Sequence, residues 1–305
     1  VAAGGQPVFG VTKFMDRSQE EFDATNKGRK NRGMLPDDYA EKTFKKQGLT
    51  GRNPASIPET VDWTAAGYVT PVKNQGQCGS CWAHSATEQI ESQWMLAGYS
   101  MWELSVQQIN SCTAGTFGCG GGDTIGAYEQ LISGETKSNV KTPGMSTAGV
   151  ASGFMAPYQQ SMYEECTDLN CTLSCTADGV GNLTMMTPEE ALTGYFVDIS
   201  GYSYATPACT GDCDDQDLDT LNENVATVAP ASICVNAGRW NLYVGGVMTT
   251  SACGGYAYDD LDHCVQLTGY DLSASEPYYI VRNSWATNWG VDGYIYLSTE
   301  GNTCG

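Results

Sequence analysis

Histidine and basic residues are the scarcest chemical groups in this chain. The 305 residues include two histidines and 15 Lys and Arg, against 35 Asp and Glu, for a net charge of −20. This deficit of positive charge argues against nucleic acid and against anionic membranes as partners. No run of about 18 apolar residues occurs, so the sequence predicts no transmembrane helix. Any histidine base must be His84 or His263.

The charge is divided unevenly along the chain. Residues 1–56 carry ten Lys and Arg against seven Asp and Glu, a net charge of +3, and residues 57–305 carry five against 28, a net charge of −23. A basic N-terminal segment can dock on such an acidic body, and protonation of the carboxylates would weaken that attraction. An acidic surface that simply keeps the protein soluble explains the body's charge equally well.

Cysteine is abundant, with 13 residues in the chain. This usage indicates an oxidising compartment and a disulfide framework, and the odd count leaves at least one free thiol. The chain begins at Val1 without an apolar signal region, so we expect any secretory signal to have been removed. We therefore expect a protein of the secretory pathway, in a lysosome or vacuole or outside the cell.

The most informative stretch contains the sequence C-G-S-C-W at residues 78–82. A helical pattern follows Cys81, which places its thiol at a helix N-terminus, where the dipole favours a thiolate and lowers the thiol pKa. Three other interpretations stay open at this point: a buried structural cysteine, a redox dithiol of Cys78 and Cys81, or half of a zinc site.

Further motifs follow this cysteine in a fixed order. Gln75 precedes Cys81 by six residues, His263 follows much later, and N-S-W-x-x-x-W-G-x-x-G-Y spans residues 283–294. Together with C-G-S-C-W, these residues resemble the papain family of cysteine proteases, in its cathepsin L-like branch. The resemblance implies an α+β fold of two subdomains, one helical and one an antiparallel β-barrel-like sheet. The active-site cleft would lie between them, with Cys81 on one wall and His263 on the other.

The resemblance also implies a role for each motif residue. Cys81 would be the nucleophile, His263 the base and later the acid, and Asn283 the group that orients the imidazole. Gln75 and the backbone N–H of Cys81 would form the oxyanion hole. His84, three residues after Cys81, would be a packed substitute for an aromatic residue.

Substrate binding is assigned in the same way. The glycines Gly121 and Gly122 would hydrogen-bond an extended peptide, and Leu261 in the S2 pocket predicts an apolar P2 residue, the second residue before the scissile bond. The full set of expected substrate-binding residues is Gly121, Gly122, Cys234, Leu261, Asp262, Cys264, Trp285 and Trp289.

Cysteine pairing follows from the resemblance as well. It implies the bridges Cys78–Cys119, Cys112–Cys166 and Cys253–Cys304, leaves Cys81 free, and suggests a further bridge, Cys234–Cys264, across the S2 pocket. His263 lies 182 residues after Cys81, more than the usual 130–150, which predicts an insertion at about 167–216. The insertion holds four more cysteines and two sequons: Cys171, Cys175, Cys209, Cys213, Asn170 and Asn182. We expect disulfides there rather than zinc, and no metal or cofactor in the protein.

Residues 1–56 are predicted to be a separate unit. Gly10, Phe14 and Asp16 match a motif of the papain-family inhibitory propeptide, and Ser18 with Glu21 forms a capping box at a helix start. We interpret 1–56 as a partial propeptide, whose extended part crosses the cleft in the direction opposite to a substrate. Residues 57–305 would then be the peptidase domain.

The secondary structure can be outlined from the residue pattern. A helix is expected after Cys81 up to Gly98, and a second one at 104–112 with Ser105 as its cap. Strands are expected in segments that are rich in β-branched and aromatic residues and punctuated by glycine, at 231–235, 245–248, 264–270, 278–283 and 293–297.

The leading functional hypothesis is a cysteine endopeptidase made as a zymogen and activated at acidic pH. Its partners would be protein and peptide substrates, its own propeptide and cystatin-like inhibitors, and it would be a monomer. Two alternatives stay open: a dithiol oxidoreductase that uses Cys78 and Cys81, and an inactive binding protein on a protease fold.

Overall fold

The fold is taken from a computed structural model of the chain. It describes residues 5–30, 57–113, 115–133, 149–153, 158, 196–206 and 216–305. The predicted insertion, its four cysteines, its two sequons and Cys166 lie outside these residues. Among the described residues, no helix is both long enough and apolar enough to cross a membrane.

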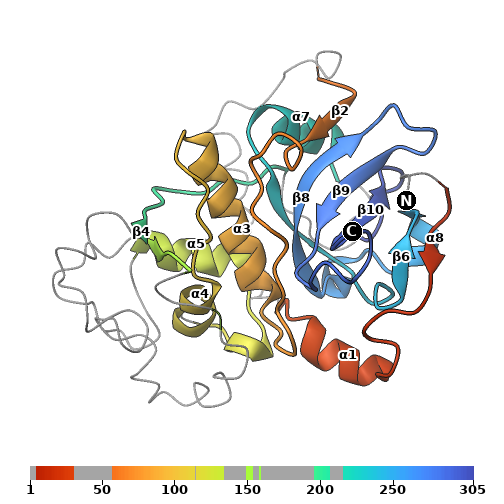
Figure 1. The fold of residues 1–305 in the computed structure, drawn as a ribbon, viewed down its shortest axis with the longest axis horizontal. Coiled ribbons are helices and arrows are strands. Elements are labelled where there is room, and N and C mark those ends of the chain that lie inside the picture. Colours follow the sequence, from red (N-terminus) through yellow and green to blue (C-terminus); the bar gives the residue numbers. More distant parts are fainter. Residues whose placement is uncertain are drawn as a thin grey trace.

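The helical subdomain is built around α3 (Cys81–Leu96). Its partners are α4 (Val106–Cys112) and α5 (Thr124–Ser133), which lie on the same side of α3 in Figure 1. Ser105 caps α4 by accepting a hydrogen bond from the backbone N–H of Gln108, as the sequence predicts. Apolar side chains between the helices form one core, which includes Trp82, Ala86, Ile90, Ile109, Ala127 and Leu131.

The second subdomain is a six-stranded sheet. Its strands follow the order β2 (Thr60–Asp62), β8 (His263–Asp271), β9 (Tyr278–Arg282), β10 (Tyr294–Ser298) and β7 (Val247–Met248), and β5 (Ala231–Val235) also pairs with β8. All pairs are antiparallel except β10 with β7, which is parallel. The predicted strands are confirmed except the one at 245–248, which is divided at Gly246 between β6 (Tyr243–Gly245) and β7. The expected sheet is antiparallel apart from the β10–β7 pair.

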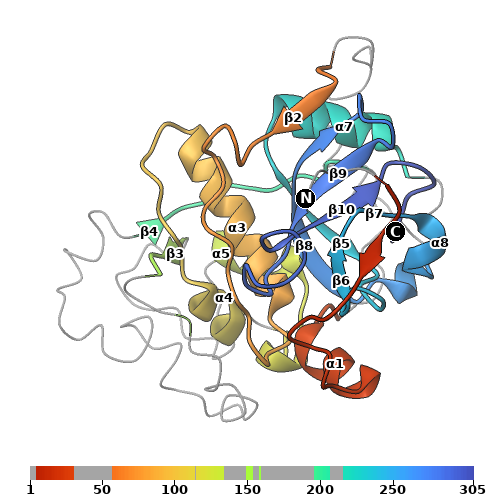
Figure 2. The same ribbon diagram turned by 45° about the vertical axis from the view of Figure 1, so that its right-hand side comes forward.

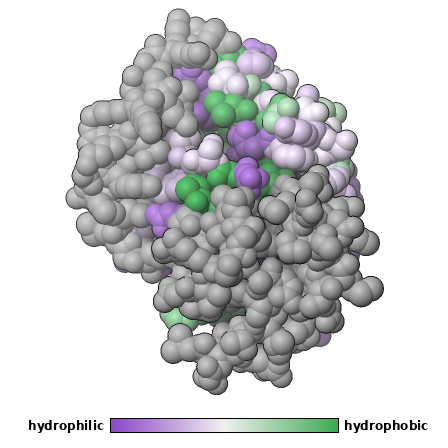
Figure 3. Space-filling view, turned by 90° about the vertical axis from the view of Figure 1, so that its left-hand side faces the viewer, coloured by the Kyte–Doolittle hydropathy of each residue, from purple (hydrophilic) through white to green (hydrophobic). Residues whose placement is uncertain are grey.

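Short elements complete the described chain. They are the strand pair β3 (Val150–Ala151) and β4 (Phe196–Val197), the helices α7 (Leu218–Thr227) and α8 (Thr250–Cys253), and the 3₁₀ turns η2 (Gly118–Gly120) and η5 (Tyr258–Asp260). On the face shown in Figure 3, hydrophobic and hydrophilic residues are interspersed over the described surface.

The two subdomains meet where α3 packs against β8. Ser85 Oγ donates to the Val265 carbonyl at 2.7 Å, and Gln266 Nε2 donates to the Glu88 carbonyl at 3.0 Å. Because β8 starts at His263 and α3 starts at Cys81, this contact brings the first residues of both elements together.

The N-terminal segment packs on the sheet subdomain. Its strand β1 (Val8–Phe9) pairs antiparallel with β6 (Tyr243–Gly245), and its helix α1 (Gln19–Asn26) lies at the end of the molecule where α3 begins (Figures 1 and 2). The predicted capping box of Ser18 and Glu21 is present at the start of α1.

Two aromatic side chains anchor this segment. Phe14 and Phe22 are fully buried, and their rings meet the Trp285 ring edge to face at 5.3 and 5.1 Å between centroids. Such pairs add to the free energy gained by burying apolar area. The docking of residues 5–30 therefore depends on an aromatic cluster that includes a predicted active-site residue.

We predict that Phe22→Ala destabilises the docked segment. Removing a buried phenylalanine costs about 3–5 kcal/mol, because both the transfer free energy and the packing are lost. The matched control is Val11→Ala, since Val11 lies in the same segment but is 79% exposed. Urea unfolding of both variants in a Cys81→Ala background measures the cost, and equal losses for the two would contradict the prediction.

Candidate active site

Cys81 is the first residue of α3 and is completely buried. Its Sγ accepts a hydrogen bond from the backbone N–H of Cys264 at 3.5 Å, across the contact between the subdomains. The structure shows Cys81 as a free cysteine. The sequence thus predicts its position at a helix N-terminus correctly.

His263 lies at the start of β8, on the other side of this contact. Its Nε2 is 2.8 Å from Asn283 Oδ1, and the Trp285 ring lies over the imidazole at 4.8 Å between centroids. Among the described residues, Nδ1 of His263 has no hydrogen-bond partner although it is buried. Asn283 therefore occupies one ring nitrogen and leaves the other available for a proton.

Gln75 is fixed next to this pair by its neighbours. Its Oε1 accepts from Ser284 Oγ at 2.6 Å, and its backbone N–H donates to the Ser284 carbonyl at 2.8 Å. Its Nε2 donates to the carbonyls of Cys78 at 2.8 Å and Asn26 at 3.1 Å. An oxyanion hole requires a donor at the position where the oxyanion will form, and in this structure the Asn26 carbonyl accepts from this amide donor.

Residues 26–30 run across this site. Gly122 donates its N–H to the Gly28 carbonyl at 2.8 Å and accepts from the Lys30 N–H at 2.8 Å, in a parallel bridge. A Cβ at Gly28 would lie 1.8 Å from the Gly79 carbonyl oxygen, so only glycine allows this approach. Asp262 accepts from the Gly28 and Arg29 N–H groups through its carbonyl.

We call this structure, in which residues 26–30 cover the site, the closed form. Burial determines the protonation states of Cys81 and His263 in it. It raises the pKa of Cys81 to about 12, although hydrogen bonds from the backbone N–H groups of Cys264, Trp82 and Gly28 act the other way. Burial lowers the pKa of His263 to about 4, against the effect of its hydrogen bond to Asn283. The expectation of a lowered cysteine pKa is therefore wrong for this form, because removal from water outweighs the helix N-terminus.

The remaining predicted binding residues surround the same place. Gly121 and Gly122 face residues 28–30, Leu261 is buried, and both Trp285 and Trp289 are inaccessible to solvent. The bridges Cys78–Cys119, Cys234–Cys264 and Cys253–Cys304 are present, as expected. Cys112 is disulfide-bonded, but its expected partner Cys166 lies outside the described residues. The bonded state of Cys78 removes it as half of a redox dithiol.

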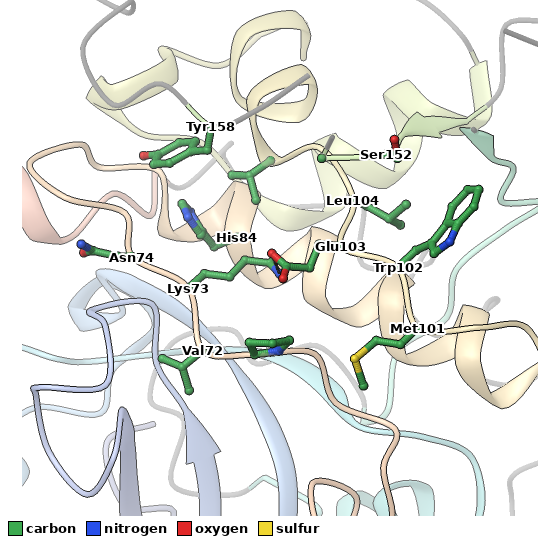
Figure 4. Close-up of a pocket in the computed structure, with 13 residues that line it drawn as sticks. Val72, Lys73, Asn74, His84, Met101, Trp102, Glu103, Leu104, Ser152 and Tyr158 are labelled. Atoms are coloured by element: carbon green, nitrogen blue, oxygen red, sulfur yellow. Dashed lines mark ion pairs between the residues drawn. The ribbon is translucent and has the colours of Figure 1, made fainter. Parts of the chain in front are cut away.

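His84 takes no part in this cluster. It is 1% exposed, its Nδ1 lies 3.0 Å from the Ser80 carbonyl, and its ring meets Tyr158 edge to face at 4.8 Å. It lines a separate cavity of about 800 Å³ with Lys73, Glu103 and Tyr158 (Figure 4). Burial lowers the pKa of His84 to about 3, so it is neutral near pH 7. The prediction of a packed residue is consistent with these contacts.

The structure contains a buried charge network beside the site that the sequence analysis does not predict. Glu88 and Glu91 of α3 are buried and form ion pairs with Arg282 at 3.5 Å and Lys73 at 3.1 Å. The signal was two acidic residues three positions apart within a helix that is otherwise buried. The network joins α3 to Arg282, the neighbour of Asn283, and to the loop that contains Lys73 and leads to Gln75.

Comparison with known proteins agrees with this geometry. The sequence profile of the family described as "Papain family cysteine protease" matches residues 57–305. A "Cysteine proteinase" of Trypanosoma brucei brucei is 33% identical over 305 residues, covering 99% of this chain, and "Cysteine proteinase 2" of Leishmania pifanoi is 30% identical, covering 97%. The chain spans 56% of the length of each of these two relatives.

A solved structure extends the likeness to the N-terminal segment. The digestive procathepsin L2 proteinase from Tenebrio molitor larval midgut is 29% identical, with a TM-score of 0.69, over 98% of this chain and 81% of that one. That structure is a proenzyme, and the match includes nearly all of the present chain. The two-subdomain fold expected from the sequence is thereby confirmed.

We predict that His84 does not influence the Cys81 thiol. After removal of residues 1–56, His84→Phe should leave the pH dependence of Cys81 alkylation by iodoacetamide unchanged, because the imidazole stays neutral. His263→Phe should raise the apparent pKa of alkylation toward the ordinary cysteine value of about 8.5, because the partner cation is lost. A shift in the His84→Phe profile would show that His84 is coupled to the thiol.

Proposed function

Because the chain belongs to the papain family of cysteine proteases, we propose that the protein is a cysteine endopeptidase made as a zymogen. The observation that carries this proposal is the assembly of Cys81, His263, Asn283 and Gln75 at one place beneath residues 26–30. These four side chains supply the nucleophile, the base, the orienting group and the oxyanion donor that acyl transfer requires.

The chemistry follows from these positions. In the open enzyme, His263 Nδ1 takes the Cys81 proton, and the thiolate attacks the carbonyl carbon of the scissile bond. The oxyanion that forms would accept hydrogen bonds from Gln75 Nε2 and the Cys81 N–H. Imidazolium then protonates the leaving amine, and a water, deprotonated by His263, hydrolyses the acyl-enzyme. Asn283 would keep the ring oriented without adding charge.

The closed form would be inactive for a specific reason. The Asn26 carbonyl accepts from both Gln75 Nε2 and Trp285 Nε1, each at 3.1 Å, so the oxyanion donor is already occupied. The same residues exclude water from Cys81 and favour the neutral thiol. These contacts support the interpretation of 1–56 as a partial inhibitory propeptide and 57–305 as the peptidase domain.

The two alternatives receive less support. A redox dithiol needs a free Cys78, whereas Cys78 is bonded to Cys119. An inactive binding protein is favoured by loss of a catalytic residue, and all four expected residues are present. We further propose protein and peptide substrates, cystatin-like inhibitors, a monomer, and a location in the secretory pathway, in a lysosome or vacuole or outside the cell.

A labelling experiment tests the catalytic assignment. A peptidyl epoxide applied at pH 5 after removal of residues 1–56 should modify Cys81 alone, as read by peptide mass mapping. Cys81→Ala should abolish both labelling and peptide hydrolysis, and His263→Ala should lower kcat/KM by about 10²–10⁴-fold, the usual contribution of a general base. Full hydrolysis by Cys81→Ala would refute the proposed function.

We also propose that the zymogen is activated at acidic pH, and the pKa shifts indicate which groups can couple release of the N-terminal segment to pH. Exchanging a neutral thiol and imidazole for a thiolate and imidazolium binds no net proton, so the catalytic pair does not couple opening to pH. Burial raises the pKa of Asp262 despite the nearby Lys27, so protonating this carboxyl alone would favour the closed form. Among the described residues of the segment, Glu21 is a carboxyl whose protonation would favour release, because its hydrogen bonds to Ser18 in the capping box lower its pKa.

We predict that protonation of Glu21 weakens the docking of the N-terminal segment. Its capping bond stabilises the docked helix above the ordinary Glu pKa of about 4.3 and is lost as the pH falls through its lower pKa in the closed form. Glu21→Gln keeps a capping acceptor but does not titrate, so it should reduce the acceleration of zymogen conversion below pH 4.3 by about two- to fivefold. Glu20→Gln is the matched control, since Glu20 lies in the same turn; an equal effect of the two substitutions would argue against the capping box.

A further inference from the structure

The side chain of Arg29 is buried, although residues 26–30 cross the surface of the predicted peptidase domain. Its guanidinium group donates from one terminal nitrogen to the carbonyls of Tyr258 and Leu261, each at 3.0 Å. Its centre lies 4.5 Å from the centroid of the Tyr258 ring. Its Nε is 3.9 Å from Asp123 Oδ2, and the side chain is 5% exposed. The cation thus meets two carbonyls, an aromatic face and a carboxylate.

The backbone places this side chain in a substrate-binding position. Arg29 forms the bridge with Gly122, and the residues on either side of it make the two hydrogen bonds to that glycine. Gly122 belongs to the backbone expected to hold an extended substrate, and Leu261 belongs to the expected S2 pocket. Arg29 therefore fills the pocket that a P2 side chain would enter.

The chemistry of this pocket suits a cation better than an apolar side chain. A buried guanidinium is stabilised by carbonyl acceptors, by an aromatic face and by an opposite charge. Asp123 is itself largely buried, with 11% of its side chain exposed, so its attraction for a cation is only weakly screened. In the closed form this carboxylate faces the Arg29 cation, and an aliphatic P2 side chain would not make that contact.

We propose that the S2 pocket selects arginine, so that the enzyme cleaves peptides with Arg at P2. This inference depends on the proposed endopeptidase function and concerns the same cleft. Asp123 supplies the charge, and Tyr258 supplies the ring and one of the two carbonyls. This proposal differs from the apolar P2 residue expected from Leu261. The P2 residue would be basic, and Arg29 of the N-terminal segment occupies its position in the closed form.

The test compares two fluorogenic dipeptides that share Arg at P1 and differ only at P2, one with Arg and one with Leu. After removal of residues 1–56, the Arg substrate should have a kcat/KM at least tenfold higher. Asp123→Asn should reduce this ratio about tenfold. Asn keeps the oxygen that accepts from the Ile125 N–H at the start of α5, so the fold is retained.

Two further variants make the result specific. Tyr258→Leu should also lower the Arg to Leu ratio, because it removes the aromatic face without changing charge. Asp219→Asn, at an exposed position in α7, is the control for net charge and should leave the ratio unchanged. Because the ratio is taken within one variant, a general loss of folded enzyme cancels.

The outcomes separate the two proposals. Equal or faster cleavage of the Leu substrate by the wild type would overturn the assignment of S2 and leave the endopeptidase function standing. An unchanged ratio in both Asp123→Asn and Tyr258→Leu would also overturn it. Failure to cleave either substrate, together with no epoxide adduct on Cys81, would overturn the proposed function and this inference with it.

Discussion

The contact between α3 and β8 is the constraint on which the rest of the structure depends. It aligns Cys81 with His263 because each begins its own element, and it is held by hydrogen bonds from Ser85 and Gln266. Buried charges reinforce it, since Glu88 pairs with Arg282 next to Asn283. Removing one partner of a buried pair leaves an uncompensated charge, so the pair makes the relative position of the two subdomains specific. Burial raises the pKa of Glu88 to about 7, even though Arg282 acts against this.

The N-terminal segment uses the same groups that catalysis would use. The Asn26 carbonyl takes the Gln75 donor, Gly28 lies against the backbone of Gly79, and Arg29 takes the pocket beside Leu261. In the proposed zymogen, these contacts would inhibit the enzyme because they occupy the groups that bind the substrate and exclude water from Cys81. The raised pKa of the thiol follows directly, because burial removes a thiolate from water.

The sequence predicts the fold class and the catalytic positions because those depend on short motifs in a fixed order. Cys81, His263 and Asn283 are each marked by their neighbours, and the capping box of α1 and the strands of the sheet are local patterns too. The protonation states are not local, since they depend on how residues 26–30 cover Cys81. The ion pair of Lys73 with Glu91 and the pocket around Arg29 also join distant segments, and their residues carry no pattern of their own. The parallel pairing of β7 with β10 also joins distant segments, because parallel strands need a crossover connection between them.

The basic N-terminal segment binds the acidic residues 57–305 through two of its cations, Lys27 and Arg29. Lys27 bonds to Asp262 at 2.6 Å and to Asp23 of its own helix at 2.7 Å, which ties the segment to the residue before His263. Arg29 instead reaches into a pocket, where its planar guanidinium bonds two carbonyls at once. A lysine there would keep the charge but would lose the planar guanidinium face against the Tyr258 ring. The two cations therefore differ in kind: Lys27 binds the segment to the residue before His263, whereas Arg29 occupies the pocket that we propose as the S2 site.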